Sequence, residues 1–176
     1  WVNAETVSDL QVEEGVVQLS LEALESDTVY NGVVWAEDGQ HRSEVFRFRT
    51  ACSEDDWRVV TFGATSCLGY TNLGWECLTR ASEDELDFFC FLGDTVYADG
   101  STTLSDYRAE WNWVMQQDSV RRLTLSTSVI AAWDDHEVDN NWWDEDVPEE
   151  QFAAAIQAFR EALPQEVGTS GGFWRK

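Results

Sequence analysis

The stretch FFCFLGDTVYADG, residues 88–100, carries the strongest structural signal in the sequence. Its apolar start, FFCFL, shows no alternation, which predicts a strand of a parallel sheet covered on both faces. Gly93 allows the backbone to turn sharply, so Asp94 should lie just past the carboxyl end of this strand, where open α/β sheets bind ligands. Tyr97 brings a phenol to the same place. A carboxylate and a phenol at the end of a buried strand predict the start of a metal site.

Two more strands are predicted on either side of this stretch in the sequence, and both end in polar groups. WRVVTFGAT (57–65) is followed by Cys67, and SVIAAW (128–133) is followed by DDHE (134–137). Taken alone, these groups are ordinary: a buried cysteine, a helix cap or an acidic loop. If the strands are parallel neighbours, however, all three ends meet at one edge of the sheet. The convergence favours a metal centre.

The residue types at these strand ends indicate which metals would bind. Carboxylates and histidine suit hard and borderline cations, while a thiolate together with a phenolate favours a strongly Lewis-acidic metal such as iron. Two ions that share one carboxylate form a site suited to in-line displacement at a phosphate ester. The residue types thus favour a metal site at this edge, and they leave open whether one ion or two would bind.

The rest of the chain divides into a β part and an α/β part. Residues 1–50 alternate like strands, with Val17, Leu19 and Leu21 on one face, and Tyr30 has the spacing of a tyrosine corner. This part resembles the last strands of a fibronectin type III-like sandwich. Residues 51–56 are the predicted linker. Helices are predicted over 73–81, over 104–117 with Ser105 as the cap, over 118–126, and from Pro148 onward.

Composition limits the partners that this chain can bind. It has 34 acidic and 11 basic residues, a net charge of -23, and its surface should repel nucleic acid and anionic membranes. No apolar run is long enough to span a membrane, and no signal peptide is visible. Because the chain begins with Trp1, we expect a preceding segment that carried a secretory signal, hence a secreted or periplasmic protein. The four cysteines lack metal-type CxxC spacing, and their pairing is left open.

Several motifs together resemble a known family. In order, they are CLG after a strand, LGDTVYADG, SDYRAEW and AAWDDHEVDNNWW, with EVFRFRTA in the N-terminal part. They look like the PhoD-like alkaline phosphatase/phosphodiesterase family of the metallophosphoesterase superfamily. The resemblance implies an α/β fold, with residues 57–176 as the N-terminal half of a metallophosphoesterase-like catalytic domain.

The resemblance also implies roles for five residues in a centre of ferric iron and calcium. Cys67 would be a thiolate ligand of iron, Asp94 would bridge the two metals, and Tyr97 would be a phenolate ligand. Asp135 occupies the place of the Asn in the superfamily's GNH motif and would bind the second metal. His136 would act near the phosphate, as leaving-group acid or as transition-state stabiliser.

One departure from the family pattern concerns the remaining ligands. The family takes further carboxylate, amide and histidine ligands from a later half of its domain, but this chain has two histidines only, His41 and His136. We therefore expect a partner chain or a C-terminal half to complete the site. The alternative is a non-catalytic binding or assembly module that retains the half-fold. A simple calcium-binding acidic loop is disfavoured because the DxDxDG spacing is absent.

Overall fold

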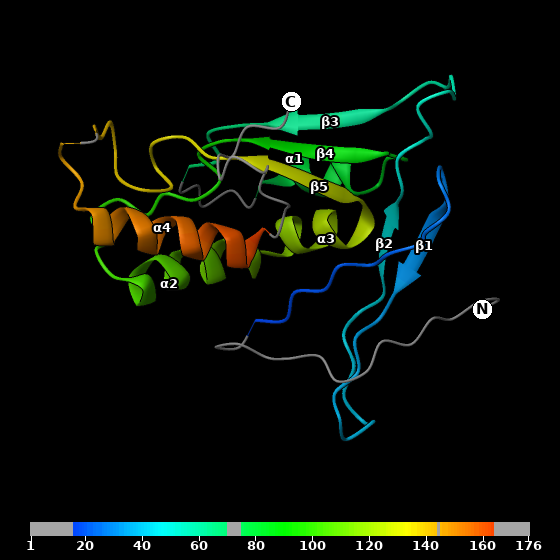
Figure 1. Cartoon of the computed structure of the whole chain (residues 1–176), viewed down its shortest axis with the longest axis horizontal. Coiled ribbons are helices and arrows are strands. Elements are labelled where there is room, and N and C mark those ends of the chain that lie inside the picture. Colours follow the sequence, from blue (N-terminus) through cyan, green and yellow to red (C-terminus); the bar gives the residue numbers. More distant parts are fainter. Residues whose placement is uncertain (1–15, 70–74, 144, 164–176) are drawn as a thin grey trace.

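The structure, a computed structural model, describes residues 16–69, 75–143 and 145–163. It shows a mixed α/β fold with a small antiparallel hairpin beside a parallel sheet and its helices (Figure 1). In chain order the elements are β1 (Val29–Gly32), β2 (Phe46–Arg49), β3 (Phe62–Thr65), α1 (Glu76–Ala81), β4 (Phe88–Leu92), α2 (Leu104–Met115), α3 (Asp118–Ser126), β5 (Ser128–Ala132) and α4 (Glu149–Ala162). No helix within the described ranges is long and apolar enough to cross a membrane.

The parallel sheet has the strand order β3-β4-β5, with β4 in the centre. Thr65 pairs with Phe91, and Leu92 pairs with Ala132, so the three strands end close to one another at one edge. This confirms the predicted parallel arrangement. The residues that follow these strands are therefore brought together by the sheet itself.

The prediction that β4 is covered on both faces is wrong for the part of the chain that the structure describes. Phe89 and Phe91 are 3% and 1% exposed, whereas Leu92 is 56% exposed. The first two belong to the core together with residues of all four helices. On the opposite face Phe62 stacks on Phe88 and stays 58% exposed. The apolar run thus belongs to a sheet with one covered and one uncovered face.

Helices α2 and α4 run side by side (Figure 1) and are joined by an ion pair. Arg108 of α2 donates to both carboxylate oxygens of Glu161 at 2.7 and 2.8 Å. The cap of α2 is Thr103, not Ser105 as predicted. Thr103 and Asp106 form a reciprocal capping box, and Ser105 lies inside the first turn. Pro148 precedes α4 as predicted.

The other boundaries also differ in part from the prediction. The first strand of the parallel sheet begins at Phe62, not at Trp57, which is 98% exposed. Helix α1 begins at Glu76; the predicted start at residue 73 lies outside the described residues. Helix α3 has the predicted bounds. The helix predicted over 104–117 ends at Met115.

Within residues 16–50, the described portion of the N-terminal part, there are fewer strands than predicted. Strands β1 and β2 pair antiparallel, and the hydroxyl of Tyr30 accepts a hydrogen bond from the Glu25 N–H at 2.9 Å, the contact that defines a tyrosine corner. The predicted strand through Val17, Leu19 and Leu21 is wrong from residue 17 onward. Within the described ranges no strand pairs with this segment, and these side chains remain exposed. Residues 1–15 lie outside the described part.

A cluster of four charges joins the hairpin region to the parallel sheet. Arg58 contacts Asp27 at 2.7 Å and Asp87 at 2.9 Å, and Arg49 contacts Asp87 at 3.3 Å. Asp87 immediately precedes β4 and also accepts the Thr61 N–H. The hydrogen bond from Arg58 holds the pKa of Asp87 down at about 2. The cluster fixes the amino end of the central strand.

This cluster predicts acid sensitivity. A carboxyl whose pKa is lowered by folding stabilises the protein above its unfolded value, 3.8, and this stabilisation is lost as the pH falls toward about 2. Between about pH 5 and pH 3 we expect the wild type to lose about 1 kcal/mol more unfolding free energy than the Asp87→Asn variant. Urea unfolding at both pH values measures this. Equal losses in the two proteins would contradict the assigned role of Asp87.

Candidate metal centre

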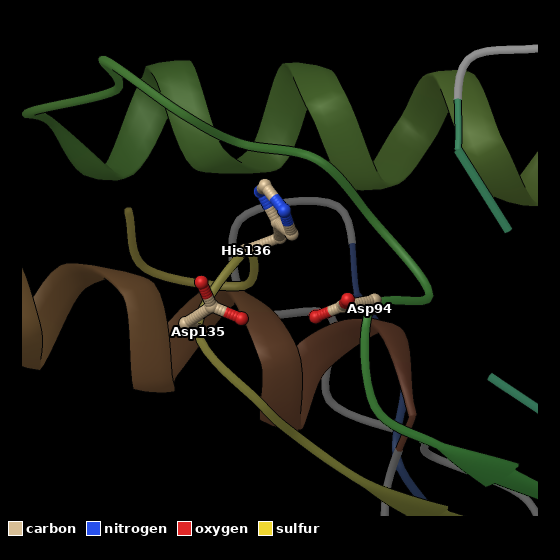
Figure 2. Close-up of side chains that lie close together, drawn as sticks. All are labelled: Asp94, Asp135 and His136. Carbon is tan, nitrogen blue, oxygen red and sulfur yellow. The ribbon is translucent and has the colours of Figure 1, made fainter. Parts of the chain in front are cut away.

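Three donor side chains lie together at the carboxyl edge of the parallel sheet. One ligand atom each from Asp94, Asp135 and His136 lies within 4.8 Å of the others. Asp94 follows β4, while Asp135 and His136 follow β5. Figure 2 shows the carboxylates of Asp94 and Asp135 directed toward one another, with the imidazole of His136 beside them. The predicted convergence of these three residues is found.

Cys67 joins this group through Asp94. Its thiol donates to Asp94 Oδ2 at 3.3 Å. The backbones also pair past the strand ends, because the N–H groups of Cys67 and Leu68 donate to the carbonyls of Gly93 and Asp94. Cys67 and Asp94 both have φ of 53°, in the left-handed region that costs non-glycine residues about 1–2 kcal/mol. Such strain at adjacent strand ends is typical of functional sites.

Gly93 allows the β4 and β5 ends to approach closely. Its φ is 103°, and a Cβ placed there would lie 2.7 Å from the Cβ of Asp134. Any larger residue would force the two loops apart. The predicted role of Gly93 as a sharp turn is thus confirmed, and close packing against the β5 end is a second reason for glycine at this position.

The donor set fits a bound cation. Asp94 is 7% exposed, yet its Oδ1 atom is buried and accepts no hydrogen bond from the described residues. An unpaired buried carboxylate oxygen is costly unless a cation or water completes it. Because another carboxylate and an imidazole lie within reach of a common point, a divalent or trivalent metal would satisfy this oxygen.

Tyr97 packs against the same group. Its ring centroid lies 4.0 Å from that of His136. Burial, together with the negative charges of Asp94, Cys67, Asp135 and Glu137, raises the pKa of Tyr97. The phenol therefore stays protonated unless a cation offsets these charges. A phenolate ligand at this position requires a metal.

His136 is held by a carboxylate that the sequence analysis did not single out. Its Nδ1 lies 2.8 Å from Asp99 Oδ1. Burial lowers the pKa of His136, but the hydrogen bond to Asp99 and the charges of Asp99, Asp135 and Asp94 outweigh burial, so the pKa is raised overall. Asp99 lies within the quoted stretch VYADG, where the spacing alone gave no sign of this contact.

Asp135 is fixed by the loop that follows it. One of its carboxylate oxygens accepts the Asn141 N–H, and its carbonyl accepts the N–H groups of Val138 and Asp139. Burial raises the pKa of Asp135, but the Asn141 N–H and the charge of His136 outweigh it, so the pKa is lowered overall. The carboxylate is therefore ionised and can bind a cation.

Glu137 lies beneath these donors and is 1% exposed. Its carboxylate accepts the N–H groups of Asp94 at 3.0 Å, Thr95 at 2.7 Å and Asp134 at 2.8 Å, with a longer contact to Val96. Burial raises the pKa of Glu137, and these N–H groups oppose that shift. Glu137 and Asp134, which flank Asp135 and His136, therefore both support the donor residues. For Glu137 the support is direct, whereas Asp134 contributes through its backbone.

The comparison with protein families identifies the chain. The model of the PhoD-like phosphatase family matches residues 62–176. The chain belongs to this family. Alkaline phosphatase D of Bacillus subtilis (strain 168) is 26% identical over 137 residues, covering 62% of this chain and 23% of that relative. A solved structure described as that of PhoD matches with a TM-score of 0.74 and 24% identity, covering 83% of this chain and 33% of that chain.

These comparisons confirm the predicted family and the α/β fold class. The likeness to the solved PhoD structure covers most of this chain, including the α/β fold described above. This chain, however, spans about a quarter of the curated relative and a third of the solved chain. This chain therefore corresponds to only part of each of these two proteins.

Proposed function

We propose that the full-length protein hydrolyses phosphate esters, monoesters or diesters or both, at a binuclear metal centre of which this chain carries the first half. The observation that carries the proposal is the convergence of Asp94, Asp135 and His136, with the buried Oδ1 of Asp94 left without a hydrogen bond in the described part of the chain. Membership of a phosphatase family supports the reaction class. We propose a phosphate-ester small molecule as the substrate and no nucleic acid partner, in keeping with the net charge of -23.

Five residues would hold the metals and the substrate. Cys67 and Tyr97 would bind ferric iron, Asp94 would bridge iron and calcium, and Asp135 would bind calcium. The contact of the Cys67 thiol with Asp94 at 3.3 Å supports this assignment, because two ligands of one ion must lie close together. When bound, the metals would supply Lewis acidity toward the phosphoryl oxygens and would acidify the attacking water.

His136 would serve as the leaving-group acid or as a hydrogen-bond donor to the phosphoryl group. Its contact with Asp99 occupies Nδ1 and leaves Nε2 as the nitrogen that can reach the substrate. The hydrogen bond to Asp99 and the charge of Asp99 favour the protonated ring by raising the pKa of His136, and Asp99 is not among the proposed metal ligands. Asp99 would orient the ring and stabilise its charged form.

The proposal extends to the finer fold assignment. We propose that residues 57–176 form the first half of a metallophosphoesterase-type α/β sandwich, joined by a linker at 51–56 to part of a fibronectin type III-like sandwich in residues 1–50. The exposed Phe62, Leu92 and Ile130 on one sheet face support this proposal, because a second layer of a sandwich would bury them. A C-terminal half or a partner chain would supply that layer and the remaining ligands. A secreted or periplasmic location is part of the same proposal.

Replacing Cys67 with serine tests the proposed iron site. Serine keeps the size of the side chain but removes the soft thiolate, so the iron content and the hydrolysis of bis-p-nitrophenyl phosphate by the full-length protein should fall together, by about 10-fold or more. Elemental analysis and initial rates measure the two quantities. Cys77→Ser, at an exposed position of α1, is the matched control. Full iron content and full activity in Cys67→Ser would show that Cys67 is a packing residue only.

A non-catalytic binding or assembly module is the second candidate. It is favoured by the small donor set, since only Asp94, Asp135 and His136 form a mutually close group among the described residues. Such a module would bind metal with no turnover. A full-length protein that carries bound metal and hydrolyses neither p-nitrophenyl phosphate nor the diester would support this candidate over the enzyme.

A further inference from the structure

One buried carboxylate connects the two loops that carry the donor residues. Glu137 Oε2 accepts the Asp94 N–H from the loop after β4 and the Asp134 N–H from the loop after β5. Glu137 Oε1 accepts the Thr95 N–H. We call Glu137 and these three N–H groups the Glu137 cluster. It joins the backbone of Asp94 to that of the residue immediately before Asp135.

The Glu137 cluster lies next to both aspartates of the proposed metal site. The Asp94 N–H belongs to one proposed ligand itself, and the Asp134 N–H belongs to the peptide next to the other. Glu137 is held in turn by the tight turn in which the Asp135 carbonyl accepts the Val138 N–H at 2.8 Å. At Gly93 the two loops are also in close contact. The carboxylate of Glu137 therefore binds both loops near the point where Gly93 packs against Asp134.

Repulsion between the carboxylates explains why the two loops must be held together. Asp94, Asp135 and Glu137 bring three carboxylates into a small, partly buried volume, and the first two repel one another whenever no cation lies between them. The N–H groups that Glu137 accepts offset part of the cost of burying its negative charge. Glu137 can thus hold the loops together without competing for the cation.

We propose that Glu137 is a positioning residue that sets the spacing of Asp94 and Asp135 and thereby the metal affinity of the site. The proposal rests on the proposed metal centre. It requires a carboxylate at residue 137, because both oxygens of Glu137 accept backbone N–H groups. A glutamine amide offers one oxygen only, so its NH₂ group would face a backbone N–H in either orientation. The glutamine variant should bind metal more weakly even though its size is unchanged.

The test compares Glu137→Gln with Glu161→Gln in the full-length protein. Glu161 is also hydrogen-bonded and partly buried, but it pairs with Arg108 between α2 and α4, away from the site. Calcium titration of the metal-free proteins by calorimetry should show affinity weakened about 10- to 100-fold in Glu137→Gln and unchanged in Glu161→Gln. Excess calcium should restore much of the hydrolysis rate of Glu137→Gln, because the substrate-contacting groups are intact.

A second measurement does not depend on metal. Hydrogen exchange of the metal-free wild type should show protected amides at Asp94, Thr95 and Asp134, and these amides should exchange faster in Glu137→Gln but not in Glu161→Gln. If Glu137→Gln does not fold, hydrogen exchange of the wild type alone tests the proposal. Unprotected amides at Asp94, Thr95 and Asp134 would then overturn it.

The outcomes separate this inference from the proposed function. Wild-type protein that binds calcium, with Glu137→Gln of equal affinity, overturns the positioning role and leaves the metal centre in place. Wild-type protein that binds no metal overturns both. Weakened binding in both Glu→Gln variants would show a general loss of stability and would also contradict a specific role for Glu137.

Discussion

Replacing Asp94 with asparagine should abolish both metal binding and ester hydrolysis in the full-length protein. Asp94 contacts Cys67 and belongs to the close group with Asp135 and His136. It also has a buried oxygen that accepts no hydrogen bond from the described residues. Since metal ions supply several kcal/mol of transition-state stabilisation, we expect kcat/KM to fall on the order of 10³-fold or more.

The experiment pairs rate measurements with metal analysis of the same samples. Asp118→Asn is the matched control, because Asp118 is an exposed residue at the start of α3 that pairs with Arg121 and Arg122. Thermal unfolding should show that both variants remain folded. An Asp94→Asn protein with wild-type metal content and near-normal rates would contradict the assignment of this residue.

The second large effect is expected at His136, and it depends on the leaving group. If His136 protonates the departing oxygen, His136→Asn should reduce kcat for an alkyl phosphate by about 10²- to 10⁴-fold. The loss should be much smaller for p-nitrophenyl phosphate, whose leaving group needs no proton. If His136 instead donates a hydrogen bond to the phosphoryl group, both substrates should suffer equally.

Asp99→Asn provides the companion measurement. Asparagine keeps a hydrogen bond to Nδ1 but removes the charge that raises the pKa of His136. We expect a smaller loss than for His136→Asn, with the same dependence on the leaving group. Wild-type rates in His136→Asn for both substrates would exclude a role of this histidine in the reaction.

The sequence was sufficient to predict that these side chains meet at one edge of the sheet, because parallel strands align their carboxyl ends. The unbroken apolar run of β4 and its stop at Gly93 placed Asp94 correctly, and the same logic placed Cys67 and the pair Asp135 and His136. The roles of these residues as ligands and acid stay predictions. What the structure adds is how these residues contact one another, such as the thiol of Cys67 with Asp94 and the ring of Tyr97 with that of His136.

Other features could not be predicted from local patterns. The contact of His136 with Asp99 joins residues 37 positions apart, and no period or motif announces such a pair. The sequence did not predict the exposed face of β4. An apolar run shows that both faces of a strand can be buried, but it does not show which element covers each face. The alternation at Val17, Leu19 and Leu21 failed for a related reason: a strand needs a neighbour, and the described residues provide none there.

The central claim is that the carboxyl edge of this parallel sheet is a metal centre for phosphate-ester hydrolysis. The most direct test is the rate of p-nitrophenyl phosphate and bis-p-nitrophenyl phosphate hydrolysis by the full-length protein, measured as isolated, after chelation, and after iron and calcium are restored. The account predicts turnover of at least one ester that disappears on chelation and returns with the metals. No hydrolysis of either ester by protein with confirmed bound metals would contradict it.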